Sequence, residues 1–265
     1  MHSAIVLLAS IGAAMAASND ICGPDSNCEF VDVSGRKTIR FRENMGPGSD
    51  DYVTRFGNKE EQMRRLRARK GDDIKTKVTI GENEIPWGCR SDIVVEDWIR
   101  EGLDELCKDN GCDEGSDKKF DSEYVVVESL DEADLIITAE GIYPDGFKDN
   151  FIDAMAAIPP SGAVTWKEKD YVIWGAVASP TTCDSPRFAN YVQVSKFEGD
   201  TNLVGHMEFK AELSIKDESG QTQYNTHIDL FLAICEMINK ILGSVAGAVS
   251  GIGGGFFGLV EVMCG

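Results

Sequence analysis

The sequence contains little histidine, with three residues in 265. His2 lies in an N-terminal apolar segment that we expect to be removed, which leaves His206 and His227. If Ser219 and Gly220 form a hairpin turn, these two histidines lie about 20 Å apart at ~3.3 Å per residue along the strands. That distance is too long for a shared metal ion or a catalytic triad, so either histidine could act only as a lone acid or base.

Familiar catalytic and metal-binding motifs are also missing. The chain has no Cys-x-x-Cys, Gly-x-Ser-x-Gly, His-Glu-x-x-His, P-loop or EF-hand pattern. Gly253, Gly255 and Gly258 match a dinucleotide fingerprint in letters, but too few residues follow them to complete a βαβ unit. We therefore expect no cofactor and no metal ion, and the sequence favours a protein without catalytic activity.

Basic residues are the minority, with 26 Lys and Arg against 45 Asp and Glu and a formal net charge of -19. A field of this sign repels phosphate backbones, so we expect no nucleic-acid partner. The imbalance is uneven along the chain. Residues 36–79 hold 13 basic and 7 acidic side chains, whereas residues 80–265 hold 13 and 34. The basic N-terminal part therefore complements the acidic remainder.

The first residues predict export from the cell. Ala4–Ala17 is an uncharged apolar run, too short to span a bilayer, and it ends in the small-x-small pattern Ala14-Met15-Ala16. We interpret residues 1–16 as a signal peptide and expect the mature protein to be secreted and extracellular.

The cysteines agree with an oxidising compartment, because all eight follow this segment. An even number in an exported chain predicts disulfides. Cys22 with Cys28 and Cys107 with Cys112 are candidate pairs because they are close in sequence, and the remaining pairing stays open. The eight are Cys22, Cys28, Cys89, Cys107, Cys112, Cys183, Cys235 and Cys264.

Residues 17–74 form the basic part, which we interpret as an N-terminal module or a propeptide. Residues 31–42 alternate around a Ser-Gly turn and predict a hairpin, and Asn58 with Glu61 predicts the start of a short helix. The basic residues that follow, beginning with Arg64 and Arg65, allow three interpretations. They form a solvated helix face, a dibasic cleavage site for a kexin-like protease, or a patch for anionic surfaces.

Residues 75–180 predict a compact α/β sandwich. A strand at 75–80 precedes a helix that starts near Ser91 or Asp92 and ends near Asn110. The apolar stripe of that helix consists of Val95, Trp98, Ile99, Gly102, Leu103 and Leu106. Strands at 124–127 and 134–138, joined by an acidic turn, a helix at 147–158 and a strand at 171–177 complete the series. The order βαββαβ predicts an α+β fold with a ferredoxin-like split βαβ arrangement.

Residues 181–265 predict antiparallel strands that extend this sheet, at 191–196, 206–215 and 223–228, followed by a hydrophobic helical hairpin. Residues 241–260 carry no charge over a length that spans a bilayer. Within this span, glycine recurs every fourth residue, which on a helix makes a smooth stripe for close helix packing. The stripe consists of Gly243, Gly247, Gly251 and Gly255.

The glycine-rich span allows several interpretations. It is a Gly-rich hairpin within a soluble core, a permanent C-terminal anchor, or a segment that is sheltered at first and then inserts or forms homo-oligomers at a target membrane. No Lys or Arg follows residue 260 to stop transfer, and Cys264 suits the oxidising side, which disfavours the anchor. A lipid-anchor signal lacks its polar spacer.

In layout the chain resembles fungal killer toxins and related secreted effectors. The features that carry the resemblance are the signal peptide, the dibasic Arg64-Arg65, the disulfides, the small α/β sandwich and the Gly-rich apolar segment. The resemblance implies action at a target cell membrane or surface component. It involves no shared motif, so no functional residue is carried over.

Two other functions stay open. Glu140, Asp145, Asp149 and Asp153 surround an expected strand-to-helix loop where the carboxylate pair of a secreted hydrolase could lie. The protein could equally be a disulfide-bridged binding protein with no catalytic activity.

Overall fold

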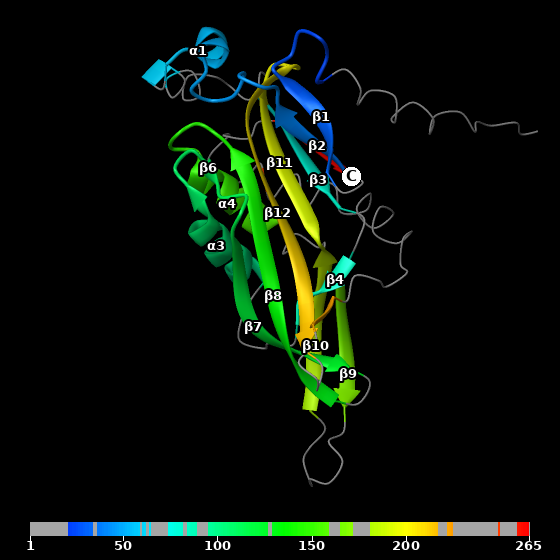
Figure 1. The fold of residues 1–265 in the computed structure, drawn as a ribbon. Coiled ribbons are helices and arrows are strands. Elements are labelled where there is room, and N and C mark those ends of the chain that lie inside the picture. The colour runs from blue at the N-terminus through cyan, green and yellow to red at the C-terminus, as the bar shows by residue number, and fades with distance from the viewer. Residues whose placement is uncertain are drawn as a thin grey trace, which may run out of the picture.

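The computed structural model describes residues 21–33, 36–58, 60–61, 64, 74–81, 84–88, 95–126, 129–158, 165–171, 181–216, 222–224, 249 and 259–264. It has a mixed α+β fold dominated by a long, mostly antiparallel sheet, with α3 (Val95–Leu106) and α4 (Lys148–Ala157) on one face (Figure 1). The predicted α+β class is confirmed.

The main sheet contains strands from most of the chain. Across the sheet they follow the order β14 (Leu259–Cys264), β3 (Ile74–Ile80), β11 (Tyr191–Glu198), β12 (Asn202–Lys216), β8 (Ser129–Ile142), β6 (Gly111–Cys112) and β5 (Cys107–Lys108). Two further strands pair with it, β7 (Asp117–Val126) with β8 and β13 (Thr222–Tyr224) with β12.

Smaller elements surround this sheet. A three-stranded sheet consists of β4 (Glu84–Pro86), β10 (Thr181–Ala189) and β9 (Thr165–Tyr171), and a separate hairpin consists of β1 (Cys28–Val33) and β2 (Arg36–Phe41). The helices are α1 (Asp50–Phe56), α3 (Val95–Leu106) and α4 (Lys148–Ala157).

Helix α3 follows the predicted apolar stripe. All six predicted positions are buried: Val95, Trp98, Ile99, Gly102, Leu103 and Leu106. Gly102 faces the Ile137 side chain of β8, where a Cβ would be in ordinary van der Waals contact at 3.4 Å. Helix α4 also has the predicted place, and it packs beside α3 on the same face of the sheet (Figure 1). The main core therefore lies between the two helices and the sheet.

The acidic turn predicted at 129–133 is a strand instead. These residues open β8, where Glu132 lies opposite Glu123 of β7. Strand pairing along the long β7–β8 ribbon overrides the low strand propensity of Asp and Glu.

The ferredoxin-like arrangement is not confirmed. The crossover from β3 through α3 to β7 exists, and the four successive antiparallel pairings between these two strands make them parallel. Three strands separate them, because the β11–β12 hairpin inserts between β3 and β8. Of the strand expected at 171–177, Tyr171 lies in β9, which pairs with β10 outside the main sheet, and residues 172–177 fall outside the described residues.

The C-terminal region is described only in part. Val249 is buried in the main core, and the predicted helical hairpin otherwise falls outside the described residues. Leu259 and Val260, expected in that hairpin, lie instead in β14, which pairs in parallel with β3. Among the described residues, no helix is long and apolar enough to cross a membrane.

The core contact of α3 can be tested by truncation. Leu106 is 4% exposed at the end of the buried stripe, so Leu106→Ala should lower the free energy of unfolding by about 2–5 kcal/mol, because it removes apolar contacts and leaves a cavity. Glu101→Ala, on the exposed face of the same helix, should cost less than ~1 kcal/mol. Denaturant unfolding measures both, and equal small losses would mean that α3 does not pack as described.

Candidate functional site

The N-terminal hairpin lies on the face of the main sheet opposite the helices. Strand β12 shows this by alternation, since Met207 and Phe209 belong to the helix-side core while His206 and Glu208 face the other way. Arg40 of β2 reaches Glu208 and Glu140 on that second face. We call residues 21–33 and 36–58 the hairpin layer, and their contact with β8, β11 and β12 the seam.

A small apolar cluster seats the hairpin layer at one end of the seam. It contains Cys28 and Ile39 from the hairpin together with Phe197 and Leu203 from the sheet, all buried. The Cys22–Cys28 disulfide closes a loop beside this cluster, within the hairpin layer itself. The second described disulfide, Cys107–Cys112, pins the β5–β6 hairpin at the end of α3. Both of the suggested close pairs are therefore present.

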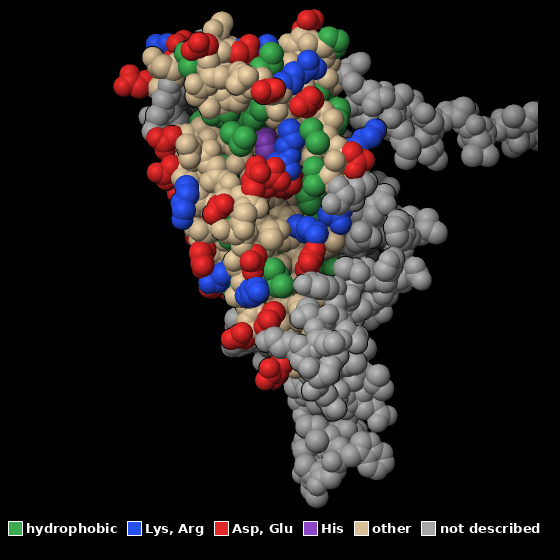
Figure 2. Space-filling view, viewed as in Figure 1, with side chains coloured by type: hydrophobic (Ala, Val, Ile, Leu, Met, Phe, Trp, Pro, Cys, Tyr) green, Lys and Arg blue, Asp and Glu red, His purple; other side chains and the backbone are tan. Residues whose placement is uncertain are grey.

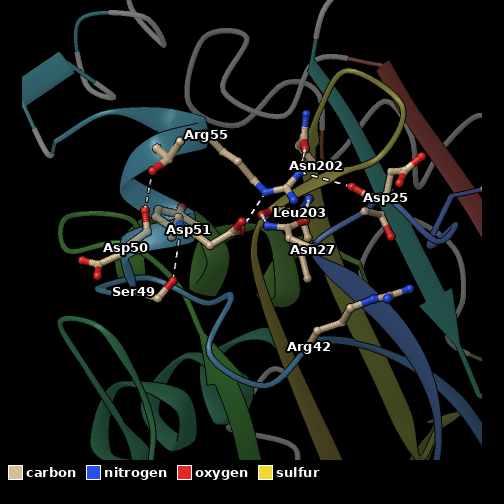
Figure 3. Close-up of polar contacts among 12 residues, drawn as sticks. Asp25, Asn27, Arg42, Ser49, Asp50, Asp51, Arg55, Asn202 and Leu203 are labelled. Atoms are coloured by element: carbon tan, nitrogen blue, oxygen red, sulfur yellow. Dashed lines mark hydrogen bonds and ion pairs between the residues drawn. The ribbon is translucent and has the colours of Figure 1, made fainter.

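Two buried amide side chains join the layers by hydrogen bonding to backbone groups. Asn27 of the hairpin layer donates to the carbonyl of Leu203 and accepts from its N–H, both at 2.8 Å (Figure 3). In the opposite direction, Gln193 of β11 donates to the carbonyl of Ile39 at 3.0 Å and accepts from its N–H at 3.1 Å. Each amide thus replaces the hydrogen bonds that a neighbouring strand would supply.

Helix α1 strengthens the same end of the seam. Its N-cap Ser49 accepts from the Tyr52 N–H, and the Tyr52 hydroxyl donates to the Val204 carbonyl at 2.7 Å. Arg55 in its last turn donates to the Asn202 side chain at 3.0 Å and to the Asp25 carbonyl at 3.3 Å (Figure 3). Burial, followed by the charge of Glu198, raises the pKa of Tyr52 well above its usual range, so its hydroxyl stays a donor.

An ion cluster fills the middle of the seam. The Arg40 guanidinium donates to both oxygens of Glu140 and, at 2.8 Å, to one oxygen of Glu208. The other Glu208 oxygen accepts from the Tyr191 hydroxyl at 2.9 Å and the Gln193 amide at 3.0 Å. The side chains of Arg40 and Glu208 are only 13% and 8% exposed. All four carboxylate oxygens therefore already accept hydrogen bonds from protein donors.

Burial shifts two titrating groups of the seam in opposite directions. It raises the pKa of Glu208 to about 7 even though Arg40 acts in the lowering direction. It also lowers the pKa of His206 to about 3, and the nearby Arg40 adds to this shift. His206 is therefore neutral at ordinary pH, whereas Glu208 titrates near neutrality.

Beside the ion cluster lies a recess of about 130 Å³. Charged side chains of both signs line it, and Figure 2 shows acidic and basic groups next to each other on this face. Arg36 lies over the Tyr191 ring at 5.2 Å, and the charge of Glu140 raises the pKa of Glu114 at the rim. The recess could hold a small polar group. Within the described ranges, no three His, Cys, Asp or Glu side chains converge on a possible metal position.

The predicted carboxylate cluster does not assemble. Glu140 joins the seam, but its neighbour is Glu208 on the adjacent strand, directly opposite in the register. Asp153 instead pairs with Arg100 between α4 and α3. The sequence signal for the seam was the charge contrast between residues 36–79 and the rest, which does not single out Arg40 or Glu208.

The other predicted site residues lie partly outside the described residues. The Asn58 cap is present, because its side chain accepts from the Glu61 N–H at 3.0 Å, and Arg64 is 78% exposed in the helical turn that follows. Arg65, Cys89, Cys235 and the stripe Gly243, Gly247, Gly251 and Gly255 fall outside the described residues, as does His227. Cys183 and Cys264 lie in β10 and β14.

Comparison with known proteins adds no family: no protein-family model, curated protein or solved structure matches the chain.

The pH dependence of stability tests the two shifted groups. Because the pKa of Glu208 is raised from 4.5 to about 7, its contribution to stability is full below pH 4.5 and is lost as pH rises through 7. The lowered pKa of His206 acts in the other sense, so stability is lost as pH falls from 6.5 towards 3. The two contributions oppose each other between pH 4.5 and 6.5.

We therefore expect Glu208→Gln to become more stable relative to wild type as pH rises from 4.5 to 7. His206→Phe should become more stable relative to wild type as pH falls below 6.5. Denaturant unfolding across this range measures both differences, with Glu101→Gln on the exposed face of α3 as the control. Differences that stay constant with pH would contradict the assignment.

Proposed function

We propose that the protein is a secreted, disulfide-bridged protein, toxin- or effector-like, that acts at the surface or membrane of a target cell through its Gly-rich apolar C-terminal segment. Two disulfides in short loops support an oxidising compartment. The acidic composition supports a partner other than nucleic acid.

The observation that carries this proposal is how the Gly-rich span contacts the body. Val249, inside the span, is completely buried in the main core. Leu259 and Val260, at its end, belong to β14 and pair with β3. An apolar segment that later acts at a membrane must first be sheltered, and the burial of Val249 together with the strand pairing of Leu259 and Val260 supplies such shelter. A segment that stays permanently in the core would make the same contacts. A functional test distinguishes this interpretation from a segment that is sheltered first and then acts at a membrane.

Vesicle leakage separates these two interpretations. Purified protein should release dye from lipid vesicles, and Gly247→Ile or Gly251→Ile should abolish release by holding the packed helices apart. The informative variant keeps the melting temperature of the wild type but loses leakage, because added volume can also strain a buried hairpin. Wild-type protein that leaves vesicles intact across several lipid compositions and pH values would contradict the membrane proposal.

We also propose that the chain is processed twice, after Ala16 and after Arg65. The exposed side chain of Arg64 on a short helical turn supports access by a protease. Intact mass measurement of the non-reduced secreted protein should give a first residue of Ala17 and a second cut after Arg65. A secreted chain that keeps residues 1–16 contradicts the signal peptide, and an uncut Arg65 contradicts the dibasic site.

The hydrolase alternative has less support from the geometry. Glu140 and Glu208 form a close carboxylate pair, but Arg40, Tyr191 and Gln193 occupy their oxygens. A general acid must have a proton free to give to its substrate. The seam therefore supports a role in binding and in holding the layers together.

A further inference from the structure

We propose that the face of the sheet formed by Gln193, Glu208 and Glu140 is a binding surface for an extended segment that carries an arginine, and that β2 is its resident occupant. Another segment of the same chemistry can then take the place of β2, wherever the protein acts.

The surface recognises both the backbone and a side chain of β2. Gln193 grips both the N–H and the carbonyl of Ile39, which any extended residue except proline offers. Arg40, the next residue, then places its guanidinium between Glu140 and Glu208. Recognition of extended peptides commonly combines these two elements, main-chain hydrogen bonds for affinity and a side-chain pocket for specificity.

No disulfide ties β2 to this surface. Cys22 and Cys28 bond to each other, and the sequence has no further cysteine before Cys89. The hairpin layer is therefore held by non-covalent contacts and by the chain that continues from residue 58. A cut in that chain would leave a fragment that can exchange.

Strand β2 does not use all of the hydrogen-bonding groups beneath it. The Ser195 hydroxyl and both ring nitrogens of His206 are buried under the hairpin layer, with no hydrogen-bond partner in the part of the chain that the structure describes. Phe41 covers His206 with an apolar ring at 5.8 Å between centroids. The surface thus offers polar groups that a different segment could satisfy.

The experiment uses the full chain with a site-specific protease sequence in place of residues 65–70. The protein is folded and oxidised intact, and then cut. On a denaturing gel without reductant the two fragments should separate, and on native gel filtration they should elute together. This engineered cut makes the result independent of any natural processing at Arg65.

Displacement then tests the surface itself. A fluorescent, oxidised peptide of residues 21–58 should replace the cut fragment, and Arg40→Ala in that peptide should weaken its binding at least ten-fold. Lys37→Ala is the matched control, because it removes one positive charge from an exposed position of the same strand. These changes are made only in the peptide, so the folding of the protein is unaffected.

Three outcomes would overturn the proposal. Fragments that stay joined in denaturant without reductant would show a covalent link. Equal binding of the Arg40→Ala and Lys37→Ala peptides would show that Glu140 and Glu208 do not recognise the arginine. A cut fragment that never exchanges with excess peptide, even at raised salt, would show that β2 is a fixed part of the fold.

Discussion

Where the hairpin layer meets the main sheet, the two do not share a strand edge, so backbone groups buried at the contact need partners from side chains. Asn27 and Gln193 provide them, each gripping one residue of the opposite layer. Leaving such groups unpaired would cost about 1–3 kcal/mol each. These two amides hold Ile39 over β11 and Leu203 beside the β1 end of the hairpin.

The fixed position of Ile39 determines the electrostatics. It places Arg40 over two glutamates that neighbouring strands hold directly opposite each other. Without Arg40, two carboxylates at this spacing on one face would repel each other. The N-terminal part is basic and the remainder of the chain is acidic. In the buried part of the seam, this contrast is represented by one arginine, Arg40, and two glutamates, Glu140 and Glu208.

Elements that depend on local pattern could be predicted from the sequence. The buried stripe of α3 repeats with helical period, and the β1–β2 hairpin alternates around a two-residue turn. The seam could not be predicted in the same way. Glu140 and Glu208 become neighbours only through the register of β8 with β12, which is set by strands far apart in the chain. The insertion of the β11–β12 hairpin between β3 and β8 is equally non-local, and it separates the fold from a split βαβ order.

Strand β14 has a consequence for how the chain folds. It pairs in parallel with β3, joining residues 75–80 to residues 259–264. Contacts of such long sequence separation form slowly, because a large loop must close before they contribute. Until residue 264 has been made, one edge of β3 has no neighbour from this strand, and an open edge is a template for pairing with other chains. Slow closure of that edge makes the newly made chain vulnerable to aggregation, so the conditions under which it folds matter as much to its yield as its final stability.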